Sequence, residues 1–269
     1  MEKENKTTEE IKRPSFLMNI SEGYRALKDF KKSSDFIKSY YAETPGDGHP
    51  VLVIPGLLGN KSTTYRLRKF IKKMGYKPYD WRQGVNMGDI EDVEPLQQLL
   101  ADIYQKHQTK VTVIGWSLGG IYARELAKMN PEQVRQVITL GSPFANISAP
   151  NNASWLLEWL HGDIHTDPRY SAWLSNLSDP APVPTTAVYS KEDGVVPWKV
   201  CREPKEDSMH QNVEVTGSHL GLTNNASVWF LIADRLPYSM ANWEPFVVPF
   251  NTPAEVIFPN LERQVKFFK

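Results

Sequence analysis

Six short apolar runs alternate with helical stretches along this chain, and that alternation limits its choice of fold more than any other feature. The runs are "PVLVIPG", "YKPYDW", "KVTVIG", "VRQVITLGSP", "TTAVYS" and "NVEVTG". Apolar residues at three- and four-residue steps, typical of amphipathic helices, fill most of the stretches between them. Strands that are joined by crossover helices form parallel sheets covered on both faces. The sequence therefore predicts an α/β protein with a mostly parallel, doubly wound sheet.

The chain of 269 residues divides into three parts. Residues 1–47 combine a charged tail with an amphipathic helical segment, which we expect to lie against the main body. Residues 48–246 form the core, which begins at the end of the linker "AETPGDGHP". Residues 247–269 are a C-terminal extension to which the sequence assigns no role. The apolar residues of the helical segment are Phe16, Ile20, Tyr24, Leu27, Phe30 and Phe36.

An insertion at about residues 145–183 interrupts the alternation. The stretches "SWLLEWLHG" and "SAWLSNL" bring three tryptophans into it, Trp155, Trp159 and Trp173. These side chains either fill the core or belong to a small helical cap over a cleft. A cap explains why so much aromatic surface gathers in an insertion rather than in a strand of the sheet. We therefore predict a cap.

Charge and cysteine content exclude several classes of protein. Lysine plus arginine number 31, as do aspartate plus glutamate, so no overall field attracts nucleic acid. A single cysteine, Cys201, excludes an internal disulfide framework and the usual zinc-binding spacings. The opening "MEKENKTTEEIKRPSF" has no apolar signal region, and no segment approaches the roughly 18 apolar residues of a membrane span. We expect a soluble, cytoplasmic protein with no nucleic-acid partner.

The stretch "GWSLGG" directly follows the apolar run "VTVI". Ser117 at its centre is either a nucleophile on a tight strand-to-helix turn or part of an ordinary glycine-rich corner. The pattern recurs by chance too often to decide, but its surroundings favour the nucleophile. Gly115 and Gly119 leave room for a sharp turn, and "IYARELA" supplies the helix that follows. We therefore predict that Ser117 is a nucleophile.

A serine hydroxyl needs a general base, and the base needs an orienting carboxylate. Functional groups in a parallel sheet collect at the carboxyl ends of the strands. His219 in "TGSHLGL" follows a predicted strand at that end, whereas His210 precedes the same strand. Asp193 in "KEDGVVPW" follows another strand, and we expect its longer neighbour Glu192 to be solvated. His219 is therefore the predicted base and Asp193 its partner.

Two backbone N–H groups are expected to bind the oxygen of the tetrahedral intermediate that such a nucleophile forms. One belongs to Leu118, directly after the nucleophile. The other comes from the loop "PGLLGN", in which Leu57 is favoured and Leu58 is the alternative. Trp116, on the other side of Ser117, is a further candidate for the wall of the substrate site.

The sequence resembles the α/β-hydrolase superfamily, in which "GWSLGG" is similar to the nucleophile elbow and the triad occurs in the same chain order. Within it, "VIPGLLGN", "SLGGIYARELA", "LGSPF", "YSKEDGVVPW" and "VTGSHLGLTNN" resemble a bacterial group of esterases and lipases, over roughly residues 50–246. The resemblance implies a carboxylester hydrolase with an acyl-serine intermediate and no cofactor. It carries over Ser117, Asp193, His219, Leu57 and Leu118. The chain departs from the wider family by lacking a clear antiparallel pair of strands before the first parallel one.

Other functions stay open on the sequence alone. An acyltransferase or a thioesterase would use the same triad, and a binding protein could keep the fold without the chemistry. The three tryptophans of the predicted cap, together with Trp116, favour a substrate with a hydrophobic acyl group.

Two polar clusters have alternative interpretations. The stretch "HGDIHTD" alternates His161, Asp163, His165 and Asp167, but its setting favours a polar loop over a metal site. The stretch "YRLRKFIKKMGYK" is basic. We interpret it as a solvated outer face, and weak attraction to anionic lipid is the alternative. Its basic residues are Arg66, Arg68, Lys69, Lys72, Lys73 and Lys77.

Overall fold

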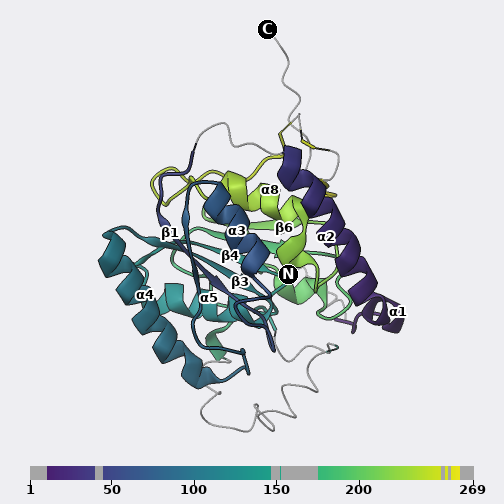
Figure 1. Ribbon diagram of the computed structural model, residues 1–269. Coiled ribbons are helices and arrows are strands. Elements are labelled where there is room, and N and C mark those ends of the chain that lie inside the picture. Colours follow the sequence, from purple (N-terminus) through teal and green to yellow (C-terminus); the bar gives the residue numbers. More distant parts are fainter. Residues whose placement is uncertain are drawn as a thin grey trace, which may run out of the picture.

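A six-stranded parallel sheet forms the centre of the protein (Figure 1). The computed structural model describes residues 11–39, 45–146, 152, 175–249, 252–253 and 256–260. The strands are β1 (Pro50–Ile54), β2 (Lys77–Asp80), β3 (Val111–Trp116), β4 (Val134–Leu140), β5 (Thr185–Tyr189) and β6 (His210–Glu214). Each strand overlaps one of the six apolar runs, and all neighbouring strands pair in parallel. The predicted α/β architecture is therefore confirmed.

The strand order β2-β1-β3-β4-β5-β6 places a change of direction beside β1. The chain moves outward from β1 to β2 and then returns to the other side of β1 as β3. The loops after β1 and β3 diverge at this point, where sheets of this kind bind their ligands. Ile54 at the end of β1 pairs with Gly115 near the end of β3. The loop after β1 therefore starts beside the turn that carries Ser117.

Helices cover both faces of the sheet. The longer helices are α2 (Glu22–Ser39), α3 (Tyr65–Lys73), α4 (Val93–His107), α5 (Leu118–Met129) and α8 (Ala226–Arg235). The shorter ones are α1 (Phe16–Ile20), η1 (Ile90–Asp92), η2 (Trp198–Cys201) and η3 (Leu222–Asn224). Figure 1 shows α2, α3 and α8 on one side of the sheet and α4 and α5 on the other.

The side chains of β1 divide between these two layers. Val51 and Val53 pack with the α3 and α8 side, whereas Leu52 and Ile54 pack with the α4 and α5 side. Successive residues of a strand point to opposite faces, so a strand that is covered twice has to be apolar throughout. This is why the core strands appear in the sequence as unbroken apolar runs.

The helix α2 lies against the body of the protein with its polar face inward. An amphipathic helix ordinarily buries its apolar stripe, but Tyr24 and Leu27 are each 64% exposed. Phe36 near the end of the helix is buried, as are Glu22 and Asp29. The remaining apolar residues of the segment, Phe16, Ile20 and Phe30, are also exposed.

The reason lies in the loops that α2 covers. Their backbone N–H groups, including those of Ser218 and His219, are buried and need acceptors. The carboxylates of Asp29 and Glu22 accept hydrogen bonds from them. A carboxylate is a strong acceptor for such groups, so the polar face of the helix is the one that packs.

The basic residues of α3 do not form a uniformly solvated face. The guanidinium of Arg66 lies 3.6 Å from the ring centre of Phe30 and donates to Ser34 Oγ at 2.8 Å, so Arg66 joins α3 to α2. Arg68 donates to the carbonyl oxygen of Lys61 at 2.6 Å. Lys69, Lys72 and Lys73 of α3 are exposed, as is Lys77 at the start of β2.

The described part of the C-terminal extension adds to the core on the α8 side. Val248, Val256 and Phe258 are buried, and the ring centre of Phe258 lies 6.2 Å from that of Phe230 in α8. Within the described residues, no helix combines the length and apolar character that crossing a bilayer requires. Most of the predicted cap, including Trp155, Trp159 and Trp173, lies outside the described residues.

Candidate active site

Ser117 lies on the sharp turn between β3 and α5. Its φ of 53° and ψ of −125° are strained values for a residue with a side chain. A Cβ on Gly115 would lie 2.2 Å from the carbonyl oxygen of Gly119, and one on Gly119 would lie 2.5 Å from that of Ile54. Only glycine fits at either position. The strand and the helix therefore meet closely enough to present Ser117 at the carboxyl edge of the sheet.

Three side chains from three loops form one chain of hydrogen bonds. Ser117 Oγ lies 2.9 Å from Nε2 of His219, and Nδ1 of His219 lies 2.5 Å from Oδ2 of Asp193. The three residues follow β3, β6 and β5, whose carboxyl ends share one edge of the sheet. The carboxylate accepts the proton on Nδ1, which leaves Nε2 free to accept the serine proton. The structure thus brings together the predicted nucleophile, base and carboxylate.

Both oxygens of Asp193 are engaged. Oδ1 accepts from the N–H groups of Val195 at 2.8 Å and Val196 at 2.7 Å, while Oδ2 faces His219. Burial by itself lowers the pKa of His219. The negative charges of Asp193 and Glu22 and the hydrogen bond to Asp193 outweigh burial, so the pKa of His219 is raised above its ordinary value.

Three other histidines have partners away from Ser117. Nδ1 of His210 lies 2.8 Å from Asp207, at the opposite end of β6 from His219. His49 bonds to Asp47 and Thr112. His107 bonds to the hydroxyl of Tyr79. The stretch with His161, Asp163, His165 and Asp167 lies outside the described residues.

The loop after β1 touches the nucleophile directly. A Cβ on Gly56 would lie 2.9 Å from Cβ of Ser117, so only glycine fits at position 56. This contact brings the next residue, Leu57, to the edge of the site. The N–H of Leu58 is already bonded to the carbonyl oxygen of Asn86 at 2.7 Å. Leu57, rather than Leu58, therefore remains the better candidate for an oxyanion donor.

Leu118 is the first residue of α5, and its side chain is buried. Backbone N–H groups in the first turn of a helix have no partner within the helix and lie at its positive end. The N–H of Leu118 therefore suits a developing negative charge beside Ser117.

Trp116 is buried behind the nucleophile. Its indole N–H donates to the carbonyl oxygen of His219 at 3.1 Å, and the two ring centres lie 5.9 Å apart. The contact in the structure is thus with the loop that carries the histidine. A role for Trp116 in the substrate wall stays a prediction, as it does for the three tryptophans of the insertion.

Two residues beside the triad were not identified from the sequence. Gly141 follows β4 with a φ of 58°, and a Cβ there would lie 3.2 Å from Nδ1 of His219 and 3.3 Å from Oδ2 of Asp193. Glu22 reaches the backbone of His219 from α2. The signal for Gly141 was present, since "LGSP" ends the predicted strand run "VRQVITLGSP". Glu22 gave none, because polar residues of an amphipathic helix usually face water.

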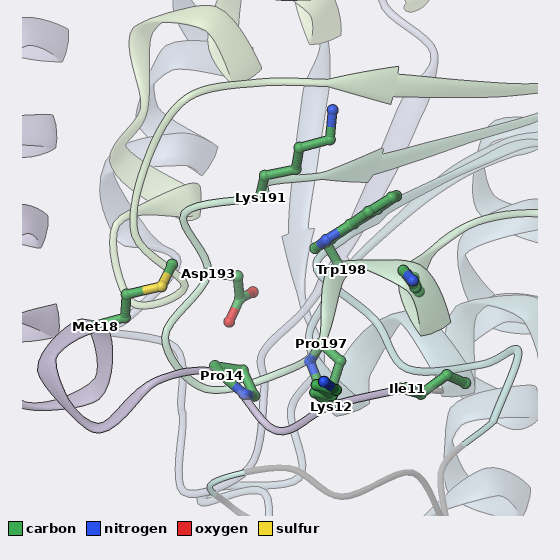
Figure 2. A pocket seen from close by; sticks show the side chains of 9 residues that line it. Ile11, Lys12, Pro14, Met18, Lys191, Asp193, Pro197 and Trp198 are labelled. Atoms are coloured by element: carbon green, nitrogen blue, oxygen red, sulfur yellow. The ribbon is translucent and has the colours of Figure 1, made fainter. Parts of the chain in front are cut away.

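A cavity of about 520 Å³ lies beside Asp193, and Figure 2 shows its wall. Neither Ser117 nor His219 lines this cavity. Ile11, Lys12, Pro14 and Met18 of the N-terminal segment line it together with Lys191, Pro197, Trp198 and Lys199. The N-terminal segment therefore covers the loop that carries Asp193.

Comparison with protein families gives one matching model, described as a PGAP1-like alpha/beta domain, over residues 89–160. That region contains β3, Ser117 and α5. A pimeloyl-[acyl-carrier protein] methyl ester esterase from Aliivibrio fischeri is 29% identical over 108 residues. The match spans 39% of this chain and 40% of that esterase.

Solved structures match over a larger part of the chain. The mature lipase BlEst2 of Bacillus licheniformis has a TM-score of 0.57 at 18% identity, covering 73% of this chain and 96% of that one. A monoacylglycerol lipase from Paleococcus ferrophilus has a TM-score of 0.52 at 13% identity, covering 72% of this chain and 95% of that one. At such low identity these likenesses establish the fold, and the chemistry has to be argued from the site.

Proposed function

The chain is an α/β-hydrolase-fold protein related to bacterial lipases and esterases, and we propose that it hydrolyses carboxylic esters through an acyl-serine intermediate. One observation carries the proposal, the continuous hydrogen bonding from Ser117 through His219 to Asp193. A serine that is bonded to a buried histidine–carboxylate pair differs chemically from an ordinary surface serine, because its proton has an acceptor in place.

In the first step, Nε2 of His219 takes the proton of Ser117 as Oγ attacks the ester carbonyl carbon. The imidazolium that forms is stabilised by Asp193, which also holds the ring in the tautomer with Nδ1 protonated. The tetrahedral intermediate collapses when His219 returns the proton to the leaving alcohol. Water then attacks the acyl-serine by the same route, which releases the acid and restores the serine.

The oxygen of each tetrahedral intermediate would be held by the N–H groups of Leu57 and Leu118. Support comes from the contact of Gly56 with Ser117 and from the place of Leu118 at the start of α5. These donors are fixed by the backbone before the substrate arrives. Loss of one such donor typically lowers turnover by about 100- to 1,000-fold.

The substrate is proposed to be an ester with a hydrophobic acyl group. The lipases and the methyl ester esterase named above support the ester class. The tryptophans Trp155, Trp159 and Trp173 support the apolar acyl group from sequence alone. An activity profile over p-nitrophenyl esters of increasing chain length tests this. A preference for the shortest esters that persists when these tryptophans are truncated contradicts it.

A covalent probe tests the nucleophile. A fluorophosphonate reporter should label the wild type and should fail to label Ser117→Ala. The control is Ser62→Ala, which alters an exposed serine outside the hydrogen-bond chain and should leave labelling unchanged. A folded wild type that resists labelling would make the chain a non-catalytic binding protein on this fold.

An acyltransferase or a thioesterase would be labelled equally. Product analysis with alcohol and thioester substrates separates these two enzymes from an ester hydrolase.

Weak contact with anionic lipid is the remaining proposal about partners. It is supported by the exposed lysines Lys69 and Lys72 of α3 and Lys77 of β2. Binding to vesicles that contain anionic lipid should weaken as salt increases. Binding that is indifferent to salt contradicts this interpretation.

A further inference from the structure

We propose that Glu22 is a positioning residue that fixes the position of the loop bearing His219 relative to the loop bearing Asp193. Glu22 belongs to α2, outside the sheet and far from the triad in sequence. The inference rests on the proposed hydrolase function and assigns the N-terminal helix a part in it.

The carboxylate of Glu22 reaches both loops. Oε1 accepts from the N–H of Gly194 at 2.8 Å, directly after Asp193, and from the N–H of His219 at 3.1 Å. Oε2 accepts from the N–H of Leu220 at 2.9 Å. Three backbone donors from two loops therefore converge on one side chain, which is 4% exposed. Glu22 is thus a second link between the two loops, beside the direct bond from Asp193 to His219.

Arg25 supports Glu22 from the next turn of the helix. Its Nη2 donates to Oε1 of Glu22 at 2.8 Å, and its Nη1 donates to the carbonyl oxygen of Glu192. Arg25 therefore orients the carboxylate and also holds the residue before Asp193. Asn19 adds a bond to the carbonyl oxygen of Gly194 at 3.1 Å. The loop of Asp193 is thus attached to the helical segment at consecutive peptide groups.

Asp29 provides a second anchor on the same face of α2. Residues seven apart in a helix lie on one side of it, which places Asp29 in line with Glu22. Oδ2 of Asp29 accepts from the N–H of Ser218 at 3.1 Å and from its hydroxyl at 3.0 Å. Three successive residues of the histidine loop, Ser218, His219 and Leu220, are therefore held by α2 through their backbone N–H groups.

This arrangement has a geometric and an electrostatic consequence. A displacement of about 1 Å between reacting groups can cost about 100-fold in rate, so attaching both loops to one carboxylate protects the Ser117–His219 distance. The charged groups that face His219 from the elements around it are Asp193 and Glu22, with Asp29 and Arg25 behind them. The charge of Glu22 adds to that of Asp193 in raising the pKa of His219.

The test compares Glu22→Gln with the wild type and with Asp35→Asn. The matched control removes a carboxylate from the outer face of the same helix, where Asp35 pairs with Lys38 at 3.3 Å. Each protein is assayed for kcat and KM against a p-nitrophenyl ester across pH, with circular dichroism to establish folding. We expect Glu22→Gln to lower kcat by about 10- to 100-fold with little change in KM, because Glu22 does not touch the substrate. In Glu22→Gln the acidic limb of the pH–activity profile, where activity is lost as His219 becomes protonated, should move to lower pH. Asp35→Asn should match the wild type.

Arg25→Gln should have the opposite effect. It leaves the charge of Glu22 uncompensated, so the acidic limb of the pH–activity profile should move to higher pH. A purely structural disturbance would not shift the two limbs in opposite directions. If Glu22→Gln does not fold, an unmoved limb in Arg25→Gln overturns the inference. The inference is also overturned if Glu22→Gln has the same kcat and the same pH–activity profile as Asp35→Asn. In both cases the labelled, active wild type leaves the proposed function intact, whereas a wild type without esterase activity refutes the proposed function first.

Discussion

The indole N–H of Trp116 donates to the carbonyl oxygen of His219 across 3.1 Å, so the neighbour of the nucleophile holds the backbone of the base. Trp116→Phe keeps the aromatic ring and removes this bond. We expect kcat to fall severalfold with KM unchanged, because the loop of His219 loses one restraint. Assays with short and long acyl esters check this. A KM that rises only for long acyl groups would instead place Trp116 in the substrate wall.

Removal of the nucleophile and the base should show that they act as a unit. We expect Ser117→Ala and His219→Ala each to lower kcat by at least about 10⁴-fold, and the double variant to be little worse than either. The measurement is ester hydrolysis at a pH well above the acidic limb. Losses that multiply in the double variant would mean that one of the two residues acts independently of the other.

The pH profile should report the raised pKa of His219. The base works only when it is neutral, so activity is lost as pH falls through a pKa above about 6.5, the ordinary value for histidine. Asp193→Asn removes the negative charge beside the ring and should move this limb to lower pH. It should also lower kcat by about 10²- to 10⁴-fold. A limb at the same pH in both proteins would assign it to another group.

The space around the His219–Asp193 pair can be tested at Gly141. Gly141→Ala adds a methyl group at a φ of 58°, with its Cβ 2.7 Å from Cδ1 of Leu222 and 3.2 Å from Nδ1 of His219. Gly84→Ala is the matched control, since Gly84 has a φ of 80° and nothing within 4 Å. Both should lose about 1–3 kcal/mol of unfolding free energy from backbone strain, as measured by denaturant unfolding. Only Gly141→Ala should lose activity as well.

The inverted orientation of α2 predicts an uneven response to truncation. Phe36→Ala should lower the free energy of unfolding by about 3–5 kcal/mol, because the ring is fully buried. Leu27→Ala should change it by less than about 0.5 kcal/mol, since that side chain is 64% exposed. Denaturant unfolding measures both. A large loss of unfolding free energy in Leu27→Ala would show that the apolar face of the helix is covered.

The candidate site could be located from the sequence because its signals are local. The apolar runs mark the strands, and the chain order marks where each strand ends. Ser117, Asp193 and His219 each follow such an end, and the carboxyl ends of parallel strands share an edge. The glycines around Ser117 have a local cause too, since the strand and helix on either side of the turn meet there.

The contacts around the triad could not be located in this way. Arg66 looked like part of a solvated basic helix, but it packs on Phe30 of α2. The bond from the indole of Trp116 to the backbone of His219 had no local signal either. Each depends on a partner that is distant in the chain, and no local pattern identifies that partner.

The sequence by itself determined the six strands, the α/β class and the residues that stand at the strand ends, because periodicity and chain order are local properties. Only the tertiary structure decided which face of α2 turns inward. Glu22 meets Gly194 and His219 across 172 and 197 residues of chain. The choice was made by buried backbone N–H groups in those loops, which needed acceptors that an apolar stripe could not supply.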